Sequence, residues 1–299
     1  MLTIVTATYN RAHTLPNLYK SILKNKKFDK DITWLIIDDG SVDNTKELVN
    51  KWIKEKQIKI NYFYQKNAGK MAAINNYITK VDTELCTEVD SDDYLTDNAV
   101  KIILDNYTEK IKNSNAYGML FRRFFIGKDK QTHLPKEEKE IKIFDLYNKK
   151  GFAFDSVIVF KSNIRKKYKY KLENNEKFIT EARMYNELDL NYDGVFLIDN
   201  AVVNCEYLED GYSRNINKLF INNPYGYFEY HKECFYQDFK GISFKKRLYF
   251  IKHYIMFGCL TKKSKIYVIK NCKGTINKIL TLLLVIPGYI KTKHRFNKK

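Results

Sequence analysis

Short apolar runs typical of strands alternate with helical patterns over the first 110 residues, and this alternation restricts the folds open to the chain. Runs rich in β-branched and aromatic residues predict strands over residues 3–7, 33–37, 58–63 and 84–89. Helical patterns follow them, over about residues 14–24, 43–56, 69–79 and 96–110. This order favours an α/β fold with a Rossmann-like, mostly parallel sheet flanked by helices, and it favours ligand binding at the carboxyl ends of the strands.

A polar block follows each of the four predicted strands. The blocks contain Thr8, Tyr9 and Arg11; Asp38 and Asp39; Asn67 and Lys70; and Asp90, Ser91, Asp92 and Asp93. Taken singly, Asp38 and Asp39 fit a turn with a helix cap, and Lys70 fits a surface lysine. Because the carboxyl ends of parallel strands share one edge of a sheet, we expect the four blocks to line one crevice.

The fourth block places three carboxylates within four residues, Asp90, Asp92 and Asp93. Like charges this close are costly unless a positive charge is present, so the cluster predicts a bound cation. In an extended segment Asp90 and Asp92 point the same way, and hard oxygen ligands favour Mg²⁺, Mn²⁺ or Ca²⁺ over zinc. Tyr94 and the missing turn glycine make an EF-hand a poor fit. A solvated acidic start of the following helix is the alternative interpretation.

Charge divides the chain into two regions. Of the net charge of +18, the segment 214–299 carries +16, from 19 Lys and Arg against 3 Asp and Glu. We therefore predict a catalytic or binding domain over residues 1–213 and a basic helical region over residues 214–299 that meets an anionic membrane or another polyanion. The five cysteines form no C-x-x-C pair, and no signal-peptide pattern opens the chain, so a cytoplasmic location is expected.

The basic region mixes lysines with apolar residues, most clearly over residues 244–257 and 276–287. The apolar run 279–286 is too short to span a bilayer, but basic flanks beside it suit helices lying on anionic lipid. The alternative is that these helices pack on the catalytic domain and leave a solvated basic face. Nucleic-acid binding is not expected, because the basic excess lies away from the acidic block and no nucleic-acid module is recognised.

The four blocks together resemble the nucleotide-sugar domain of family 2 glycosyltransferases, which have the GT-A fold. The resemblance is close over residues 2–97 and looser to about residue 213. It is carried by the segments Thr6-Ala-Thr-Tyr-Asn-Arg11, Ile37-Asp-Asp-Gly-Ser-Val-Asp-Asn-Thr45, Asn67-Ala-Gly-Lys-Met-Ala-Ala-Ile-Asn75 and Asp90-Ser-Asp92, the last of which is similar to the family's D-x-D motif.

The resemblance implies a role for each block. The backbone of the first block and Tyr9 would pack on the nucleotide base, and Thr8 and Arg11 would also bind the nucleotide-sugar. Asp38 and Asp39 would hydrogen-bond uracil and ribose. Asn67 and Lys70 would lie beside the diphosphate. Asp92 would bind Mn²⁺ or Mg²⁺ directly, Asp90 would contact ribose or the metal shell, and Ser91 would bind the nucleotide-sugar.

An inverting transfer also needs a general base for the acceptor hydroxyl. The segment 174–185 resembles the family's base-bearing helix start, and Glu181 is the predicted base, with Glu176 as the second candidate. The sequence reads Thr180-Glu181 where Glu-Asp is commoner in the family. A helix-start carboxylate without a catalytic role is the alternative.

Two further segments have weaker predicted roles. The block 207–214 resembles a loop that closes over the donor, with Asp210 in a turn and Arg214 near phosphate, although both also fit ordinary turn residues. Arg122 and Arg123 follow a predicted strand over residues 117–121 and are expected to be exposed basic residues.

The implied activity is inverting, metal-dependent transfer of one sugar from a UDP-sugar to a hydroxyl of a lipid-linked or other glycan acceptor. Capsular polysaccharide or exopolysaccharide synthesis at the inner face of the plasma membrane, by a peripheral protein, is the implied setting. The only tryptophans are Trp34 and Trp52, so the Gln/Arg-x-x-Arg-Trp motif of processive synthases is absent. A catalytically silent, nucleotide-sugar-binding scaffold remains the alternative.

Overall fold

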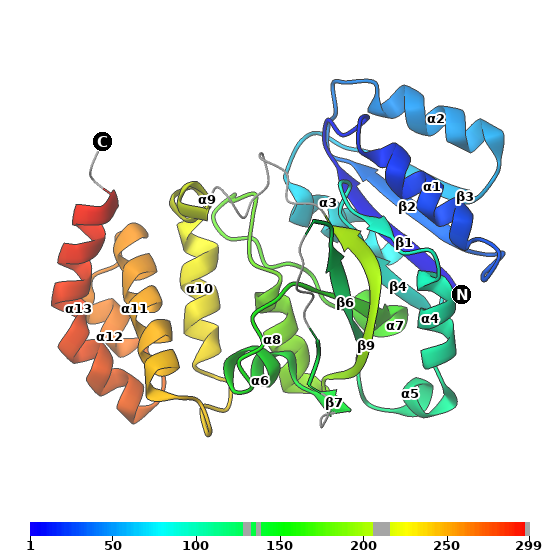
Figure 1. Ribbon diagram of the computed structural model, residues 1–299. Helices are drawn as coiled ribbons and strands as arrows, with labels where there is room; N and C mark the ends of the chain where they lie inside the picture. Colours follow the sequence, from blue (N-terminus) through cyan, green and yellow to red (C-terminus); the bar gives the residue numbers. More distant parts are fainter. Residues whose placement is uncertain (128–132, 136–138, 206–215, 297–299) are drawn as a thin grey trace. The chain divides into compact units, whose positions relative to one another are not determined.

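The computed structural model describes residues 1–127, 133–135, 139–205 and 216–296, and the chain forms two compact units (Figure 1). The first unit comprises Met1–Ile143, Phe152–Lys169 and Asn191–Leu208. The second comprises Phe144–Gly151, Tyr170–Leu190 and Glu209–Lys299. Each unit has its own apolar core. The assignment of residues 1–213 to catalysis and of residues 214–299 to association stays a prediction.

The described part of the first unit is built on one mixed sheet. Its strands are β1 (Leu2–Thr8), β2 (Thr33–Asp38), β3 (Lys59–Tyr64), β4 (Leu85–Glu88), β5 (Tyr94–Leu95), β6 (Gly118–Phe125), β7 (Glu140–Ile141), β8 (Ser156–Lys161) and β9 (Val195–Cys205). They run in the order β3-β2-β1-β4-β8-β6-β9-β5, with β7 beside β9. The first four strands are parallel, and β8 is antiparallel to both of its neighbours. The predicted α/β class is confirmed.

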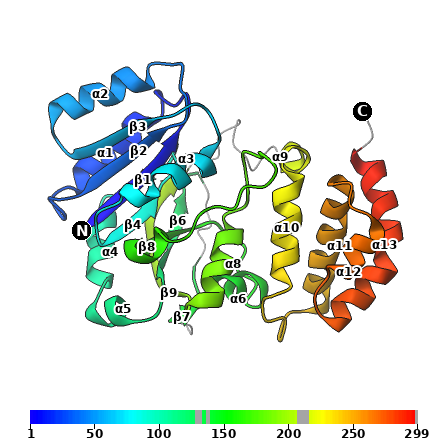
Figure 2. The ribbon, with the colours of Figure 1, turned by 180° about the vertical axis from the view of Figure 1, so that it is seen from behind.

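Helices of the first unit follow the predicted order (Figure 2). They are α1 (Leu15–Asn25), α2 (Thr45–Glu55), α3 (Lys70–Tyr77), the 3₁₀ turn η1 (Ile78–Lys80), α4 (Ala99–Asn106), α5 (Glu109–Asn113) and α7 (Ser162–Arg165). The single helix predicted over residues 96–110 is wrong, because the chain leaves helical geometry at Tyr107, where ψ is 75°. Helix α5 starts only after this break.

The four parallel strands form one end of the sheet, and β2 is an inner strand of this part. Every residue of β2 is buried, as expected for a strand with both faces covered. Trp34 on β2 donates its indole N–H to Thr6 Oγ1 at 3.0 Å. Tyr19 of α1 stacks on Trp52 of α2 with ring centroids 4.3 Å apart, so both helices close on the same aromatic core.

The second unit is helical in its described part. Its helices are α6 (Ile143–Asn148, which begins at the last residue of the first unit), α8 (Ala182–Asn191, which ends at the return to the first unit), α9 (Ile216–Asn222), α10 (Pro224–Cys234), α11 (Phe244–Leu260), α12 (Lys265–Lys270) and α13 (Thr275–Phe296). Helices α10 to α13 lie side by side in Figure 1 and share an aromatic core that includes Phe228, Tyr254 and Phe257. The predicted C-terminal helical region is therefore confirmed.

Helix α13 continues through Pro287, the residue that follows the apolar run 279–286. It packs on α11 so closely that a Cβ added at Gly288 would lie 2.5 Å from Ile255 Cγ2. Within the described ranges, no helix combines the length and apolar character needed to cross a bilayer.

Candidate functional site

Hydrogen bonds join the loops that follow β1 and β2. The amide of Asp39 donates to the carbonyl of Thr8 at 2.8 Å, and the amide of Asn10 donates to Ser41 Oγ at 2.9 Å. Asn10 adopts a φ of 53°, and its Oδ1 accepts from the Val42 amide at 2.8 Å. Asparagine tolerates this left-handed conformation better than most residues, so it suits the turn. The two strand ends therefore form one framework.

Thr8 and Tyr9 occupy different environments on this framework. Thr8 is buried, and its hydroxyl has no hydrogen-bond partner among the described residues. The side chain of Tyr9 is 48% exposed, so its ring is available to stack on a flat ligand. Arg11 is partly exposed at the start of the turn into α1. The stacking of Tyr9 on the base, and the binding of the nucleotide-sugar by Thr8 and Arg11, stay predictions.

The carboxylate of Asp38 is fully buried at the end of β2. One of its oxygens accepts from the Ser41 amide at 2.7 Å, and the other accepts from the Tyr62 hydroxyl at 2.7 Å. Burial and the Asp38 charge raise the pKa of Tyr62, so this hydroxyl stays a donor. Asp38 thus positions its loop and reaches β3, and the predicted contact with the nucleotide is untested.

Asp39 organises the loop that follows β3. Its Oδ1 accepts from Gln65 Nε2 at 2.7 Å and from the Ala68 amide at 2.8 Å, and its Oδ2 accepts from the Gly69 amide at 2.7 Å. Asn67 donates its side-chain amide to the Asp39 carbonyl at 2.9 Å. The second and third polar blocks are therefore tied together, as expected for neighbouring ends of parallel strands.

Glycines allow the close approach of these loops. Gly40 has a φ of 87°, and a Cβ at this position would lie 2.8 Å from the Asn67 amide nitrogen. Gly69 has a φ of 95° and directly precedes Lys70, the first residue of α3. A side chain at either glycine would be strained, and at Gly40 it would also push the two loops apart.

The acidic turn after β4 contacts two basic side chains of the first unit. Lys70 Nζ lies 2.5 Å from Asp90 Oδ1. Arg123 on β6 pairs with Asp93 through Nη1, and its Nη2 lies 3.8 Å from Asp90 Oδ2. Burial acts to raise the pKa of Asp90, but the charges of Lys70 and Arg123 outweigh it and lower that pKa. Asp90 and Asp93 therefore each have a cationic partner within the chain, while burial raises the pKa of Asp93 to about 7.

Asp92 differs from its two neighbours. It is partly exposed and forms no ion pair with any residue of the described ranges. Burial and the nearby Asp90 charge raise the pKa of Asp92. An ionised carboxylate that is short of positive charge is a favourable place for a cation. Ser91 is buried beside it in a turn closed by the Asp93 amide and the Asp90 carbonyl at 3.1 Å.

This donor set fits a divalent ion shared with a phosphate ligand. No group of three or more His, Cys, Asp or Glu side chains in the described ranges is arranged to hold a metal. Mg²⁺ commonly binds through only one or two carboxylates and takes further oxygens from substrate phosphates and water. Asp92 provides such a carboxylate, so the site fits Mg²⁺ or Mn²⁺ bound together with a diphosphate.

The expectation that Arg122 and Arg123 are exposed is wrong. Arg122 Nε lies 2.7 Å from Asp199 Oδ1, and only 14% of the Arg122 side chain is exposed. Arg123 on β6 contacts the acidic turn, and this role was not predicted from the sequence. Phe121 and Phe125, two positions to either side of Arg123 on β6, are buried. Side chains two positions apart in a strand lie on the same face, so Arg123 shares a face with these two phenylalanines. An arginine on a buried face needs an acidic partner, and this signal could have identified Arg123 from the sequence.

Glu181 lies in the second unit, immediately before α8. Its carbonyl accepts from the Met184 and Tyr185 amides at 3.0 and 3.2 Å, and its carboxylate accepts from the Tyr185 hydroxyl at 3.2 Å. It is partly exposed at the start of this helix. Its helix-start position matches the sequence interpretation, whereas its role as the base stays a prediction.

Glu176, the second candidate for the base, caps a helix. Its two carboxylate oxygens accept from the amides of Tyr225 and Gly226, at 2.7 Å each, at the start of α10. A carboxylate satisfies the free amides of a helix N-terminus and interacts well with the helix dipole. A structural role thus accounts for Glu176. The predicted loop over residues 207–214, with Asp210 and Arg214, lies outside the described residues.

Comparison with solved structures gives the fold type. The chain matches residues 1–349 of Staphylococcus aureus TarS in complex with UDP-GlcNAc with a TM-score of 0.60 and 13% identity, over 99% of this chain and 91% of that one. It also matches the mannosyltransferase PcManGT of Pyrobaculum calidifontis, in complex with GDP-Man and Mn²⁺, with a TM-score of 0.56 and 11% identity, over 100% and 88% of the two chains. The predicted GT-A-like fold is confirmed.

Sequence comparison identifies the family. An uncharacterized glycosyltransferase of Mycoplasma genitalium, MG060, is 38% identical over 117 residues, which cover 36% of this chain and 37% of that protein. The poly-β-1,6-N-acetyl-D-glucosamine synthase of Staphylococcus aureus is 33% identical over 106 residues, covering 36% and 25% of the two chains. The matched segments thus span between about a quarter and two fifths of these relatives. The family model described as glycosyl transferase family 2 matches residues 3–169, which is more than half of the chain, and the chain therefore belongs to glycosyl transferase family 2.

Proposed function

We propose that this protein transfers one sugar from a UDP-sugar to a hydroxyl group of a glycan acceptor, with inversion and with a divalent cation. The observation that carries the proposal is the charge pattern after β4, where Lys70 and Arg123 pair with Asp90 and Asp93, and Asp92 forms no ion pair with a described residue. Such a site favours a cation, and a cation beside a lysine suits a diphosphate. Family membership gives the same reaction class.

The donor binds along the first three strand ends. Tyr9 stacks on the base, while Asp38 and Asp39 hold the loops that surround the base and ribose. Asn67 and Lys70 lie next to the diphosphate. One structural relative was solved with UDP-GlcNAc and another with GDP-Man. We favour UDP because the block that contains Asp38 and Asp39 resembles the uracil-binding block of related enzymes. N-acetylglucosamine is the first sugar to test, given the named activity of a 33% identical relative.

The chemistry breaks the bond between the anomeric carbon and the diphosphate oxygen, whose electron pair leaves with the diphosphate. A divalent ion bound at Asp92 would offset the negative charge that develops on this leaving group. Lys70 supplies a further positive charge on the same side. The acceptor oxygen forms the new bond to the anomeric carbon, and Glu181 takes the proton of the acceptor hydroxyl.

The acceptor is proposed to be lipid-linked and to serve capsular polysaccharide or exopolysaccharide synthesis. The protein then works as a peripheral protein at the inner face of the plasma membrane, adding a single sugar per encounter. The high positive charge of residues 214–299 supports this placement, because anionic lipids attract such a surface. Membrane binding of this kind would confine the enzyme and its lipid-linked acceptor to one surface.

The proposal is tested by incubating the full chain with UDP-GlcNAc, UDP-glucose or UDP-galactose, Mn²⁺ and a membrane lipid extract, and measuring release of UDP together with labelled sugar in the lipid fraction. We expect release and incorporation with one donor in the wild type and neither in Asp92→Asn. Binding of UDP-sugar without any release or incorporation, across all donors, would instead support the scaffold function. Absence of both binding and transfer would overturn the proposal.

A further inference from the structure

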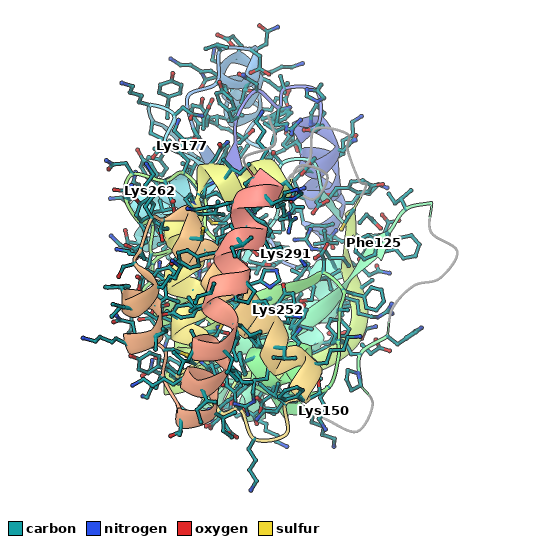
Figure 3. The ribbon with its side chains drawn as sticks, turned by 90° about the vertical axis from the view of Figure 1, so that its left-hand side faces the viewer. Phe125, Lys150, Lys177, Lys252, Lys262 and Lys291 are labelled. Atoms are coloured by element: carbon teal, nitrogen blue, oxygen red, sulfur yellow. The ribbon has the colours of Figure 1, made fainter. Side chains whose placement is uncertain are left out.

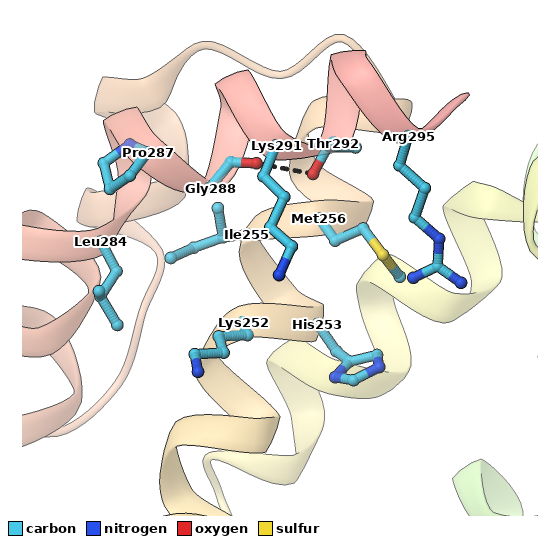
Figure 4. A pocket seen from close by; sticks show the side chains of 10 residues that line it. All are labelled: Lys252, His253, Ile255, Met256, Leu284, Pro287, Gly288, Lys291, Thr292 and Arg295. Atoms are coloured by element: carbon cyan, nitrogen blue, oxygen red, sulfur yellow. Dashed lines mark hydrogen bonds between the residues drawn. The ribbon is translucent and has the colours of Figure 1, made fainter. Parts of the chain in front are cut away.

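A pocket of about 290 Å³ lies between α11 and α13 in the second unit (Figure 4). Its apolar part contains Ile255 and Met256 from α11 and Leu284 and Pro287 from α13. Gly288 also lines the pocket, and there the helices approach so closely that Ile255 occupies the space that a side chain would need. Beyond Gly288 the α13 side of the pocket continues with Lys291, Thr292 and Arg295.

Three cationic side chains surround this apolar space. Lys252 comes from α11, and Lys291 and Arg295 come from α13; Figure 4 shows Lys291 extending from α13 toward α11. No acidic residue lines the pocket. Within the described ranges neither lysine has an ion-pair partner, and Arg295 donates to the neutral amide oxygen of Asn217 at 2.6 Å. Three like charges around one cavity favour an anionic ligand.

His253 completes the lining and does not supply a compensating negative charge. Its Nδ1 lies 2.9 Å from the Tyr249 carbonyl, and burial lowers its pKa, with a further lowering by Arg295. The imidazole is therefore neutral near pH 7 and provides a polar group without adding a fourth cation. The hydroxyl of Thr292 is already used, because it donates to the Gly288 carbonyl at 2.7 Å.

An unpartnered apolar row runs along α13 beside the pocket. Ile276, Ile279, Leu283, Ile286 and Ile290 recur at intervals of three and four residues, and each is between 53% and 67% exposed. This spacing places them on one face of the helix. Pro287 and Lys291 directly follow Ile286 and Ile290, so on the helix surface they lie between the row and the deeper pocket residues. Figure 3 looks onto α13, with Lys252 and Lys291 labelled near it.

We propose that this face of the second unit binds an anionic phospholipid bilayer, with the phosphate of one lipid held in the pocket by Lys252, Lys291 and Arg295 and with the apolar row of α13 inserted among the acyl chains. A ligand that is anionic at one end and apolar at the other matches both features at once. A second copy of the chain is a poorer match, because it would bring a second segment of net charge +16 against the first.

This inference deepens the membrane placement proposed above and is independent of sugar transfer. It differs from a general attraction of lysines to anionic lipid because it predicts that phosphate, and not charge alone, is recognised. The pocket residues are also separate from the acidic turn, which belongs to the other unit.

The test is flotation of the full chain with three kinds of vesicle: phosphatidylcholine alone, phosphatidylcholine with phosphatidylglycerol, and phosphatidylcholine with cholesterol hemisuccinate, which is anionic but has no phosphate. The two anionic vesicles are matched by their measured zeta potential. We expect the wild type to bind the phosphatidylglycerol vesicles most tightly. Equal binding to the two anionic vesicles, or to all three, would contradict phosphate recognition.

Matched variants locate the binding. Lys252→Gln/Lys291→Gln removes two pocket charges, and Lys270→Gln/Lys278→Gln removes two exposed charges of α12 and α13 that do not line the pocket. We expect the pocket variant to lose the phosphate preference and to bind phosphatidylglycerol vesicles about tenfold more weakly than the control variant, since each lysine near a surface contributes measurably. Equal losses in the two variants would overturn the pocket as the site.

Two further experiments test the role of the apolar row and distinguish a lipid phosphate from free phosphate. Leu283→Ser/Ile286→Ser should weaken flotation while leaving the phosphate preference, because it removes inserted apolar area only. Inorganic phosphate at millimolar concentration should not release the wild type from vesicles, whereas full release would show a free-phosphate site and overturn the lipid proposal. UDP binding is measured on each variant and should be unchanged, so a failure of the lipid site is distinguished from a failure of the proposed transferase.

Discussion

The guanidinium of Arg123 on β6 pairs with the carboxylate of Asp93 in the turn after β4, thirty positions earlier in the chain. The same guanidinium lies 3.8 Å from Asp90, which also pairs with Lys70. Two cations thus compensate two acids and leave the third, Asp92, available. In the acidic turn, two carboxylates are thus paired within the chain and the third forms no ion pair with a described residue. This arrangement distinguishes Asp92 from its two neighbours as the carboxylate that could bind a cation.

Arg123 is predicted to stabilise the acidic turn. Arg123→Met should lower the free energy of unfolding in urea by about 3 kcal/mol, because removing one partner of a buried ion pair leaves the other charge uncompensated. Adding Asp93→Asn to Arg123→Met should restore part of this loss. If the double variant were no more stable than Arg123→Met alone, the pair would not be the reason for the buried arginine.

Lys70 is predicted to recognise phosphate rather than the nucleoside. Lys70→Gln should weaken calorimetric binding of UDP by about tenfold, as expected for loss of a charged hydrogen bond, and should leave binding of uridine unchanged. Lys70→Arg keeps the positive charge and should retain most of the affinity. Equal weakening of UDP and uridine binding by Lys70→Gln would indicate a structural role at the start of α3.

Glu181 and Glu176, the two candidates for the base, are predicted to affect different properties when substituted. Glu181→Gln should lower kcat for transfer by about a hundredfold or more, with the KM for the donor unchanged, because a general base acts in the chemical step. Glu176→Ala should instead lower the free energy of unfolding by about 1 kcal/mol, through loss of the cap of α10. Full transfer activity in Glu181→Gln would remove this residue as the base.

His231 is predicted to make stability depend on pH. It is buried against Phe250, His253 and Phe257, and burial, with a smaller effect of His253, lowers its pKa well below 6.5. Below pH 6.5 the unfolded chain gains a proton at this position that the folded chain does not, so the free energy of unfolding falls as the pH falls. At about pH 5.5 the loss should approach about 1.4 kcal/mol.

The matched variant for this prediction is His231→Phe, which keeps an aromatic ring among the neighbouring rings. Urea unfolding at a series of pH values between about pH 5 and 7 should show a smaller slope for the variant than for the wild type. His253 contributes in the same direction, since its pKa is also lowered. Identical slopes in the wild type and in His231→Phe would show that His231 takes up its proton in the folded state.

Much of the first unit could be predicted from sequence because its signals are local. The strands β1 to β4 are short, largely apolar runs that end at turn-forming polar residues, and each agrees with its predicted range within two residues. Parallel order then follows from the intervening helices. The strands β8 and β9 were not predicted, because the pairing of β8 between β4 and β6 depends on contacts far apart in sequence.

The candidate site likewise combines features set by local sequence with features that depend on contacts far apart in the sequence. The placement of Asp39, Asn67 and Lys70 at neighbouring strand ends follows from the strand pattern alone. The compensation of Asp93 by Arg123 does not, since it depends on the position of β6 in the mixed part of the sheet. Likewise, Glu176 could not be identified as a helix cap until its contact with Tyr225 and Gly226 was known.

The most direct test of the central claim is calorimetric titration of UDP into the full chain with and without Mn²⁺, compared with Asp92→Asn. We predict that Mn²⁺ strengthens UDP binding to the wild type and that this enhancement is lost in Asp92→Asn, while the variant unfolds at the same temperature as the wild type or higher. UDP binding that is equally strong without the metal, or an enhancement that survives in Asp92→Asn, would contradict the assignment of Asp92 as the metal ligand.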